Sequence, residues 1–315
     1  VDDARPHGVS QRLEQLHHSG VVPERGRWRR RDLSHVGDFI SKNLDVKDVF
    51  IASCSIPVMS SATSGSDGFV RDSGRMIIGH RGLSSLAPEN TMAAFRSAVD
   101  HQVAWVEADV DIIADGTVIV CHDSTLDRTT NRSGRYGGLT VADLADIDAG
   151  GWFSPQFRGE PIPTLRNLID LMNATGLNAN IEIKPSEAGR EETLRLIDAV
   201  IAELEGVRPG VEVIVSSFSH LLLHLFKQRA PKVPVGCLYK SGTLSSDWRS
   251  TLQIVGADYI HPEDSGLTRE KVQAFRRAGY GVNVWTINSL SRANELFNWG
   301  VTGVFSDIAH QIPRH

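Results

Sequence analysis

The chain has 315 residues, 41% of them hydrophobic and 23% charged, with a formal net charge of −5 at pH 7. A mildly acidic chain argues against nucleic acid as its main partner. No apolar run approaches the ~20 residues that a membrane helix needs, so we expect no stable membrane span. The three cysteines are odd in number and far apart, which excludes a disulfide framework and a spaced zinc site. These proportions indicate a soluble globular enzyme or binding domain.

Residues 1–74 differ in composition from the rest, and we expect them to form a poorly ordered extension and linker. A Ser- and Gly-rich stretch at 60–68 is typical of a flexible linker, and the basic cluster at 25–31 is expected to be a solvated arm. Residues 51–54, Ile-Ala-Ser-Cys, have the outline of a lipoprotein cleavage box, but charged residues at 45–48 interrupt the apolar region that an export signal needs. We therefore expect a cytoplasmic protein, with export through this segment as the alternative, and a folded domain at 75–315.

From residue 76 onward, short β-branched runs alternate with amphipathic stretches of helical length. The predicted strands are 76–79, 105–113, 180–184, 211–217, 233–239, 257–260, 282–287 and 303–306. The predicted helices are 90–100, 163–173, 191–205 and 221–229, with further helical segments between the last four strands. This alternation predicts an α/β fold with a parallel sheet, and eight such units in about 240 residues fit a (β/α)8 TIM barrel. A doubly wound sheet is the alternative, but no Gly-rich dinucleotide turn follows the first strand.

One segment breaks the alternation. Asp115-Gly116 separates two alternating runs, which predicts a β-hairpin whose second strand, 117–122, is antiparallel and lies outside the barrel. A turn centred between 115 and 116 pairs position 109 with position 122. Opposed residues point to the same face, so we expect Asp109 and His122 to lie side by side.

The segment 123–161 after this hairpin is too long for an idle connector in a compact barrel. It contains a short predicted helix with Thr140 as its cap. We therefore expect a small insertion after the second strand.

Acidic residues stand near the ends of two predicted barrel strands: Glu107 and Asp109 on one, and Glu182 on the next. Because catalytic residues of such a barrel lie at the C-terminal ends of its strands, we expect these side chains to converge. Three acids pushed together repel one another unless a cation neutralises them. Ligation by oxygen alone suits a hard divalent ion, Mg²⁺ or Ca²⁺.

Two histidines and two basic residues flank these acids. His80 and Arg81 follow the first strand, His122 follows the hairpin, and Lys184 ends the strand that carries Glu182. A pair of histidines can act as general base and general acid near neutral pH, and the two basic residues supply positive charge for an anion. A metal ion, two cations, a base and an acid together describe a site for a phosphate ester.

Short motifs follow one another in a specific order over residues 76–307. They are Ile-Gly-His-Arg-Gly at 78–82, Pro-Glu-Asn-Thr at 88–91, Glu-Ala-Asp at 107–109, His-Asp at 122–123, Leu-Asp-Arg-Thr-Thr at 126–130, Pro-Thr-Leu at 163–165, Glu-Ile-Lys at 182–184 and Val-Trp-Thr-Ile-Asn at 284–288. In this combination the chain resembles the glycerophosphodiester phosphodiesterase family. The resemblance implies a TIM barrel, a divalent cation, and hydrolysis of glycerophosphodiesters, as small-molecule substrates, to sn-glycerol 3-phosphate and an alcohol.

The resemblance also implies roles for single residues. The family's catalytic histidines fall on His80 and His122, its metal ligands on Glu107, Asp109 and Glu182, and its phosphate-binding cations on Arg81 and Lys184. Trp285 matches the aromatic that lies against the glycerol end of the substrate, with a packed core residue as the alternative. Asn90 matches the Pro-Glu-Asn-Thr element and is equally a candidate N-cap for the following helix. The resemblance further implies that the insertion at 123–161 lies over the mouth of the pocket and shapes selectivity for the alcohol part of the substrate.

Other functions compete with this interpretation. A related phosphodiesterase of the phospholipase-D-like kind would act on lysophospholipids or sugar phosphodiesters with the same paired histidines and carboxylates. A non-catalytic binding barrel would be expected to lose a histidine or a ligand, and none is lost. A zinc hydrolase with His80 and His122 as ligands would be exposed by metal analysis. The chain also departs from the family after Asp307, where members often have a proline, and in its first 74 residues, which have no counterpart in compact members.

Overall fold

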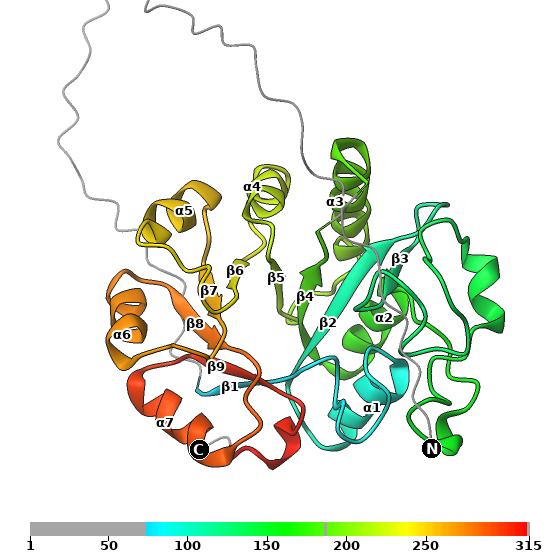
Figure 1. The fold of residues 1–315 in the computed structure, drawn as a ribbon, viewed down its shortest axis with the longest axis horizontal. Coiled ribbons are helices and arrows are strands. Elements are labelled where there is room, and N and C mark those ends of the chain that lie inside the picture. Colours follow the sequence, from blue (N-terminus) through cyan, green and yellow to red (C-terminus); the bar gives the residue numbers. More distant parts are fainter. Residues whose placement is uncertain (1–73, 186–187, 314–315) are drawn as a thin grey trace, which may run out of the picture. The chain divides into compact units, whose positions relative to one another are not determined.

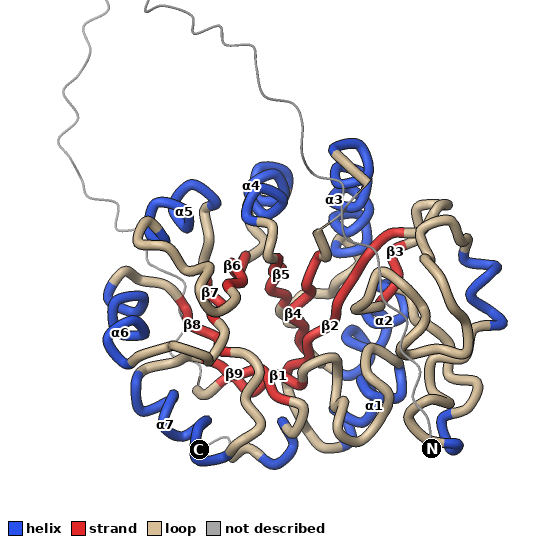
Figure 2. The backbone as a smooth tube through the Cα atoms, viewed as in Figure 1, coloured by secondary structure: helices blue, strands red, loops and turns tan. Residues whose placement is uncertain are grey.

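Eight parallel strands close into a barrel in the computed structural model, which describes residues 74–185 and 188–313. They are β1 (Met76–Gly79), β2 (Trp105–Ile112), β4 (Asn178–Ile183), β5 (Val213–Ser217), β6 (Val235–Tyr239), β7 (Tyr259–Pro262), β8 (Gly281–Val284) and β9 (Gly303–Ser306). Hydrogen bonds join them in the order β1-β9-β8-β7-β6-β5-β4-β2, and the pairing of β2 with β1 closes the ring (Figure 2). The predicted TIM barrel is confirmed. The extension predicted at 1–74 lies outside the described residues, apart from its last residue.

Helices surround this ring of strands (Figure 1). In the described part they are α1 (Met92–Asp100), α2 (Leu165–Thr175), α3 (Arg190–Leu204), α4 (His220–Arg229), α5 (Trp248–Val255), α6 (Arg269–Arg277) and α7 (Leu290–Trp299). Five begin at a Ser or Thr whose side chain accepts a hydrogen bond from the backbone N–H three residues later: Thr91, Thr164, Ser219, Thr268 and Ser289. Such caps satisfy N–H groups that a helix leaves without partners. None of the helices that the structure describes is long and apolar enough to cross a membrane.

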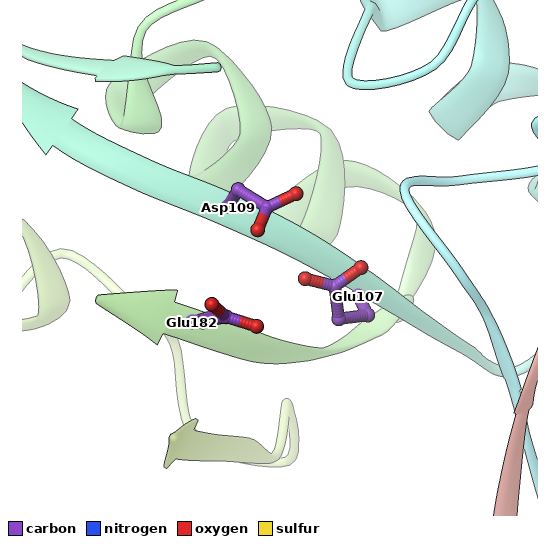
Figure 3. Close-up of side chains that lie close together, drawn as sticks. All are labelled: Glu107, Asp109 and Glu182. Carbon is purple, nitrogen blue, oxygen red and sulfur yellow. The ribbon is translucent and has the colours of Figure 1, made fainter. Parts of the chain in front are cut away.

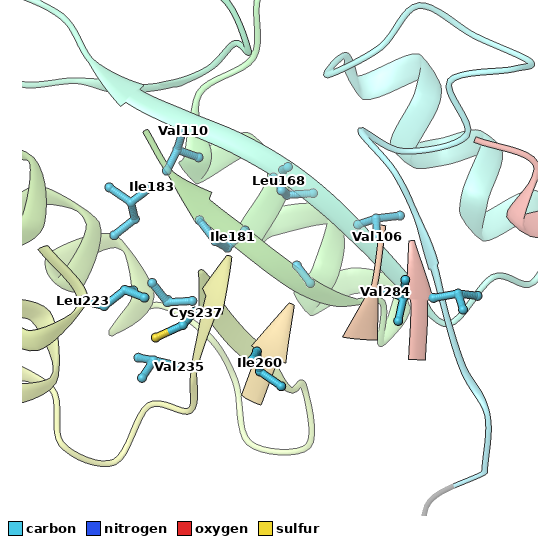
Figure 4. Packing of buried hydrophobic residues seen from close by; sticks show 14 of the residues in the cluster. Val106, Val110, Leu168, Ile181, Ile183, Leu223, Val235, Cys237, Ile260 and Val284 are labelled. Carbon is cyan, nitrogen blue, oxygen red and sulfur yellow. The ribbon is translucent and has the colours of Figure 1, made fainter. Parts of the chain in front are cut away.

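Alternate residues of each barrel strand meet different surroundings. Val106 and Val110 of β2 and Ile181 of β4 pack outward into the core between the strands and helices such as α2 and α4 (Figure 4). The residues between them point into the barrel, because side chains alternate along a strand. This period of two places Glu107 and Asp109 inside the barrel, between buried valine and alanine neighbours.

The hairpin after β2 forms as predicted, but its register differs by one residue. β3 (Val118–Val120) pairs antiparallel with β2 and lies outside the ring, with Val110 opposite Val120. The Ile113 N–H donates to the Thr117 carbonyl at 3.1 Å, so the loop has three residues rather than two, and Gly116 takes the positive φ of 92° that such a loop requires. The expected pairing of Asp109 with His122 is therefore wrong, because the backbone carbonyl of Asp109 accepts from the Cys121 N–H at 3.0 Å.

The insertion after β3 builds a small core of its own. It contains two short 3-10 helices, η1 (Val141–Asp146) and η2 (Pro155–Phe157), and Thr140 caps the first in a reciprocal capping box with Asp143. Buried insertion residues, including Tyr136 and Leu144, pack against Ile119 of the hairpin. The insertion is thereby attached to the outer hairpin, beside the barrel (Figure 1).

Candidate active site

The residues singled out in the sequence meet in one cavity of about 550 Å³ at the C-terminal ends of the barrel strands. All eight of them line it: His80, Arg81, Glu107, Asp109, His122, Glu182, Lys184 and Trp285. Strands distant in the sequence contribute, because the closed barrel brings the ends of β1, β2, β4 and β8 to one rim.

Three buried carboxylates form the floor of this cavity. Asp109 stands opposite Glu182 in the pairing of β2 with β4, and Glu107 precedes Asp109 by two residues on the same face. One oxygen from each lies within 4.8 Å of the others, and the side chains face the same space (Figure 3). Burial, with the charges of Asp109 and Glu182, raises the pKa of Glu107 well above its usual range, and burial beside Asp109 raises the pKa of Glu182 to about 7.

The donor set fits a hard divalent cation. All three groups offer oxygen, and Glu107 Oε1 is buried without a hydrogen-bond partner among the described residues. A buried oxygen without a partner costs free energy, which a bound cation would offset. The raised pKa values of Glu107 and Glu182 agree with this, because burial and the neighbouring carboxylates outweigh the positive charges of Arg81 and Lys184 around them.

Two basic side chains face the acids from the rim. Lys184 Nζ lies 3.0 Å from Glu182 Oε1 and 3.3 Å from Asp109 Oδ1, and Arg81 Nε lies 3.4 Å from Asp109 Oδ2. Burial alone would raise the pKa of Asp109, but the charges of Lys184 and Arg81 outweigh it and lower that pKa. Asp109 is therefore the acid most firmly held in its charged form.

His80 and His122 each have a carboxylate at the Nδ1 atom. His80 Nδ1 lies 2.8 Å from Asp307 Oδ1, and His122 Nδ1 lies 2.6 Å from Asp123 Oδ1. A carboxylate in this position accepts the Nδ1 proton, which leaves Nε2 to exchange a proton with a substrate. Burial lowers the pKa of His122, and the nearby charge of Asp109 offsets this only in part.

The partner of His80 was not identified from the sequence. Burial alone would raise the pKa of Asp307, but its hydrogen bonds with His80 and Asn288 lower that pKa to about 2. Asp307 therefore stays ionised and holds the ring of His80. The sequence signal was its place at the end of a strand, but only the pairing of β1 with β9 brings Asp307 next to His80.

Arg128 is a second residue whose role the sequence did not reveal, although it lies in the motif at 126–130. It donates through Nη1 and Nη2 to both oxygens of Glu89 at 2.8 Å, and through Nε to Asp123 at 2.7 Å. Glu89 in turn accepts from Arg81 at 2.7 Å. A continuous chain of ion pairs thus links Arg81 to the carboxylate that holds His122.

Asn90 is not the N-cap of α1, because Thr91 takes that position. Asn90 is buried in a left-handed conformation with φ of 56°, and its Nδ2 donates to Asp109 Oδ2 at 2.8 Å. This contact orients a carboxylate of the acidic floor, so the residue serves the site rather than the helix.

The far wall of the cavity is aromatic and was not predicted beyond Trp285. The ring of Trp285 meets that of Phe218 edge to face at 5.6 Å, and its Nε1 donates to the His261 carbonyl at 2.9 Å. Tyr239 and Lys240, at the end of β6, complete this wall. No residue of the insertion at 123–161 lines this cavity, and the core of the insertion attaches it to the outer hairpin. Its place over the mouth of the pocket stays a prediction.

Comparison with known proteins agrees with this geometry. The model of the glycerophosphoryl diester phosphodiesterase family matches residues 80–310. A glycerophosphodiester phosphodiesterase of Caldanaerobacter subterraneus is 34% identical over 235 residues, covering 74% of this chain and 93% of the relative. One of Bacillus subtilis is 32% identical over 266 residues, covering 76% and 86%.

A solved structure extends the likeness to three dimensions. An Oleispira antarctica phosphodiesterase in complex with the product sn-glycerol-3-phosphate is 32% identical, with a TM-score of 0.72 over 76% of this chain and 95% of that one. The family match spans most of the described barrel, from His80 onward. The chain belongs to the glycerophosphoryl diester phosphodiesterase family and is an enzyme of that class.

Proposed function

We propose that the chain hydrolyses glycerophosphodiesters to sn-glycerol 3-phosphate and an alcohol, with a divalent cation and two histidines. The observation that carries this proposal is the pair of histidines, each held at Nδ1 by a carboxylate, on the wall of a cavity floored by three buried acids. The relative solved with sn-glycerol-3-phosphate as its product supports the substrate class.

Glu107, Asp109 and Glu182 would hold Mg²⁺ or Ca²⁺ as oxygen ligands. Such an ion neutralises charge that builds up on the phosphoryl oxygens. Arg81 and Lys184 lie on the rim above these acids and would orient the phosphate and share its charge. Trp285 would lie against the glycerol part, since its ring forms an apolar wall of the same cavity.

The histidines would move the protons. The attacking oxygen, from water or from the substrate's own glycerol hydroxyl, gives its proton to His80 Nε2 as its bond to phosphorus forms. If the glycerol hydroxyl attacks, the product of this step is a cyclic phosphate, which a water molecule then opens to sn-glycerol 3-phosphate. The bond from phosphorus to the alcohol oxygen breaks, and that oxygen takes a proton from His122 Nε2, because a simple alkoxide is a poor leaving group. Asp307 and Asp123 hold the two rings in the required tautomer. We assign His80 as the base and His122 as the acid.

An activity screen with and without metal tests this function. We expect turnover of glycerophosphocholine and glycerophosphoethanolamine that EDTA abolishes and Mg²⁺ or Ca²⁺ restores. Lysophospholipids and bis(p-nitrophenyl) phosphate belong in the same screen, because preferred turnover of a lysophospholipid would assign the barrel to the phospholipase-D-like alternative. Restoration by zinc alone would indicate a zinc hydrolase, and no turnover at all would indicate a binding barrel.

A further inference from the structure

A second cavity, of about 920 Å³, adjoins the first on the side of the insertion. His122 and Lys184 line both cavities. The wall of the second is completed by Asp111 of β2, Tyr136 of the insertion and Glu192 of α3. Because this cavity begins at the histidine assigned as the acid, it lies where a leaving alcohol would emerge.

Asp111 forms no ion pair with any residue in the part of the chain that the structure describes. Its Oδ1 accepts the backbone N–H of Ile112 at 2.8 Å, and its Oδ2 accepts the hydroxyl of Tyr136 at 2.7 Å. Both donors are neutral, so they satisfy the oxygens without cancelling the negative charge. An uncompensated carboxylate on a cavity wall attracts a positively charged ligand group.

The other charged groups of this cavity are already engaged. Arg128 lies 2.7 Å from Asp123, and Arg195 Nη1 lies 2.9 Å from Glu192. Arg195 Nη2 also donates to two backbone carbonyls at 2.9 Å, and Arg135 takes part in an interaction of its own. The charge of Lys184 acts on Asp111 from a distance, but its Nζ is held by Glu182 at 3.0 Å and Asp109 at 3.3 Å. Among the described carboxylates of this cavity, Asp111 is thus the one without an ion pair.

A third cavity, on the side of His80, is a weaker candidate for the alcohol. It measures about 480 Å³, and both of its carboxylates are paired: Glu89 with Arg81 and Arg128, and Asp307 with His80. It therefore offers less room and no unbalanced charge.

We propose that the second cavity receives the leaving alcohol and that Asp111 selects alcohols with a positive charge, such as choline or ethanolamine. The inference rests on the proposed function, because it needs a phosphodiester bound between Lys184 and His122. As the nucleophile bonds to phosphorus in the first cavity, the bond to the alcohol oxygen breaks, and that oxygen takes the proton of His122 at the border of the two cavities. The neutral hydroxyl and its cationic group then lie beside Asp111.

The substitution Asp111→Asn tests the charge while keeping the shape. The amide oxygen still accepts the Ile112 N–H, and the Tyr136 hydroxyl can accept from the amide nitrogen. We expect the ratio of kcat/KM for glycerophosphocholine to that for glycerophosphoglycerol to fall about fivefold, the size of a single charge interaction at a partly exposed site. The matched control Glu192→Gln removes a carboxylate that Arg195 already balances, so this ratio should stay within about twofold. An equal loss on both substrates, or an unchanged ratio in Asp111→Asn, would overturn the proposal.

A measurement on the unaltered protein covers the case in which the variant does not fold. Choline and 3,3-dimethylbutanol have nearly the same shape, and only choline is charged. We expect choline to inhibit at about fivefold lower concentration than the neutral alcohol, and equal inhibition contradicts the role of Asp111. If the protein hydrolyses glycerophosphodiesters without preferring the cationic one, only this inference fails. If it hydrolyses none, the proposed function fails instead.

Discussion

His80 and His122 each have one ring nitrogen held by a carboxylate, and this pairing determines which proton the ring can move. His80 is held by Asp307 and His122 by Asp123. Two rings with the same internal arrangement can differ in role only through their position relative to the substrate. Leaving-group chemistry therefore distinguishes them better than the loss of activity alone.

We expect His80→Ala and His122→Ala each to lower kcat on a glycerophosphodiester by ~10²–10⁴, the usual worth of one proton-transfer group. A p-nitrophenyl ester, whose leaving group needs little protonation, should restore far more activity to His122→Ala than to His80→Ala. Steady-state kinetics on both substrates, with metal content and circular dichroism as controls, measure this. Equal recovery in the two variants would show that the division of roles is wrong.

Glu182→Gln should weaken metal binding, because a neutral amide is a poorer ligand for a hard cation than a carboxylate. We expect the Mg²⁺ or Ca²⁺ concentration for half-maximal activity to rise at least about tenfold, and the increase in Tm on adding metal to disappear. Glu205→Gln, an exposed position after α3, is the matched control. Full activity of the unaltered protein after exhaustive chelation would contradict the metal site.

At the scale of elements, the hairpin shows how far sequence reasoning carries. The Asp115-Gly116 pair predicted the turn and the antiparallel strand, since glycine accepts the positive φ of the loop. The pair could not distinguish a loop of two residues from a loop of three. Because the loop has one residue more than predicted, Cys121 and not His122 lies opposite Asp109. His122 reaches the cavity from just beyond the strand instead.

The ion-pair chain through Arg128 leads to a prediction about the insertion. Arg128 binds Glu89 and Asp123 at once, so it links the side of Arg81, proposed to bind phosphate, to the side of His122, proposed to donate the proton. We expect Arg128→Ala to lower kcat roughly tenfold to a hundredfold, with a smaller change in KM, as removal of a supporting contact does at other sites. Added guanidinium should restore part of that loss.

Arg132→Ala is the matched control, because the only ion pair that this exposed arginine of the same insertion forms with a described residue is with Asp146, at 3.9 Å. It should leave kcat within about twofold and show no response to guanidinium. If guanidinium does not restore the kcat of Arg128→Ala and the Tm of that variant is lower, the role of Arg128 is purely structural.

At the scale of the whole molecule, the alternation of strand and helix predicted the barrel, because period and length are properties of single segments. The partners of charged groups could not be predicted in this way, because they depend on contacts between distant segments. Asp307 meets His80 across 227 residues, and only the closed order of strands makes them neighbours. The three acids were predictable because two share one strand face and the third stands in the adjacent parallel strand.

A fully buried histidine in the barrel interior should make stability depend on pH. Burial lowers the pKa of His261 from 6.5 to about 3, so the folded protein holds it neutral while the unfolded chain protonates it below about 6.5. The stability that neutral His261 gives the folded protein is therefore fully present above about pH 6.5 and is lost as the pH falls toward 3. We expect the free energy of unfolding to fall by about 2 kcal/mol between pH 7.5 and pH 5 because of this one histidine. Urea unfolding of the protein and of His261→Asn at the two pH values measures this fall. An equal fall in the protein and the variant would show that His261 is not its source.

The barrel should fold without the residues that precede β1. The Met76 N–H donates to the Thr302 carbonyl at 2.9 Å and begins the pairing of β1 with β9, and the family match starts at His80. We therefore expect a chain that starts at Met76 to have the same Tm as the full chain within about 2 °C, and kcat/KM within about twofold, because it keeps every residue of the cavity.

A chain that starts at Asn90 is the control. It lacks β1, which joins β2 to β9, so its barrel cannot close and it should not fold. Calorimetry and the metal-dependent assay measure both chains. Insolubility or loss of activity in the chain from Met76 would mean that the preceding 75 residues contribute to the barrel, and the predicted boundary near residue 75 would then be wrong.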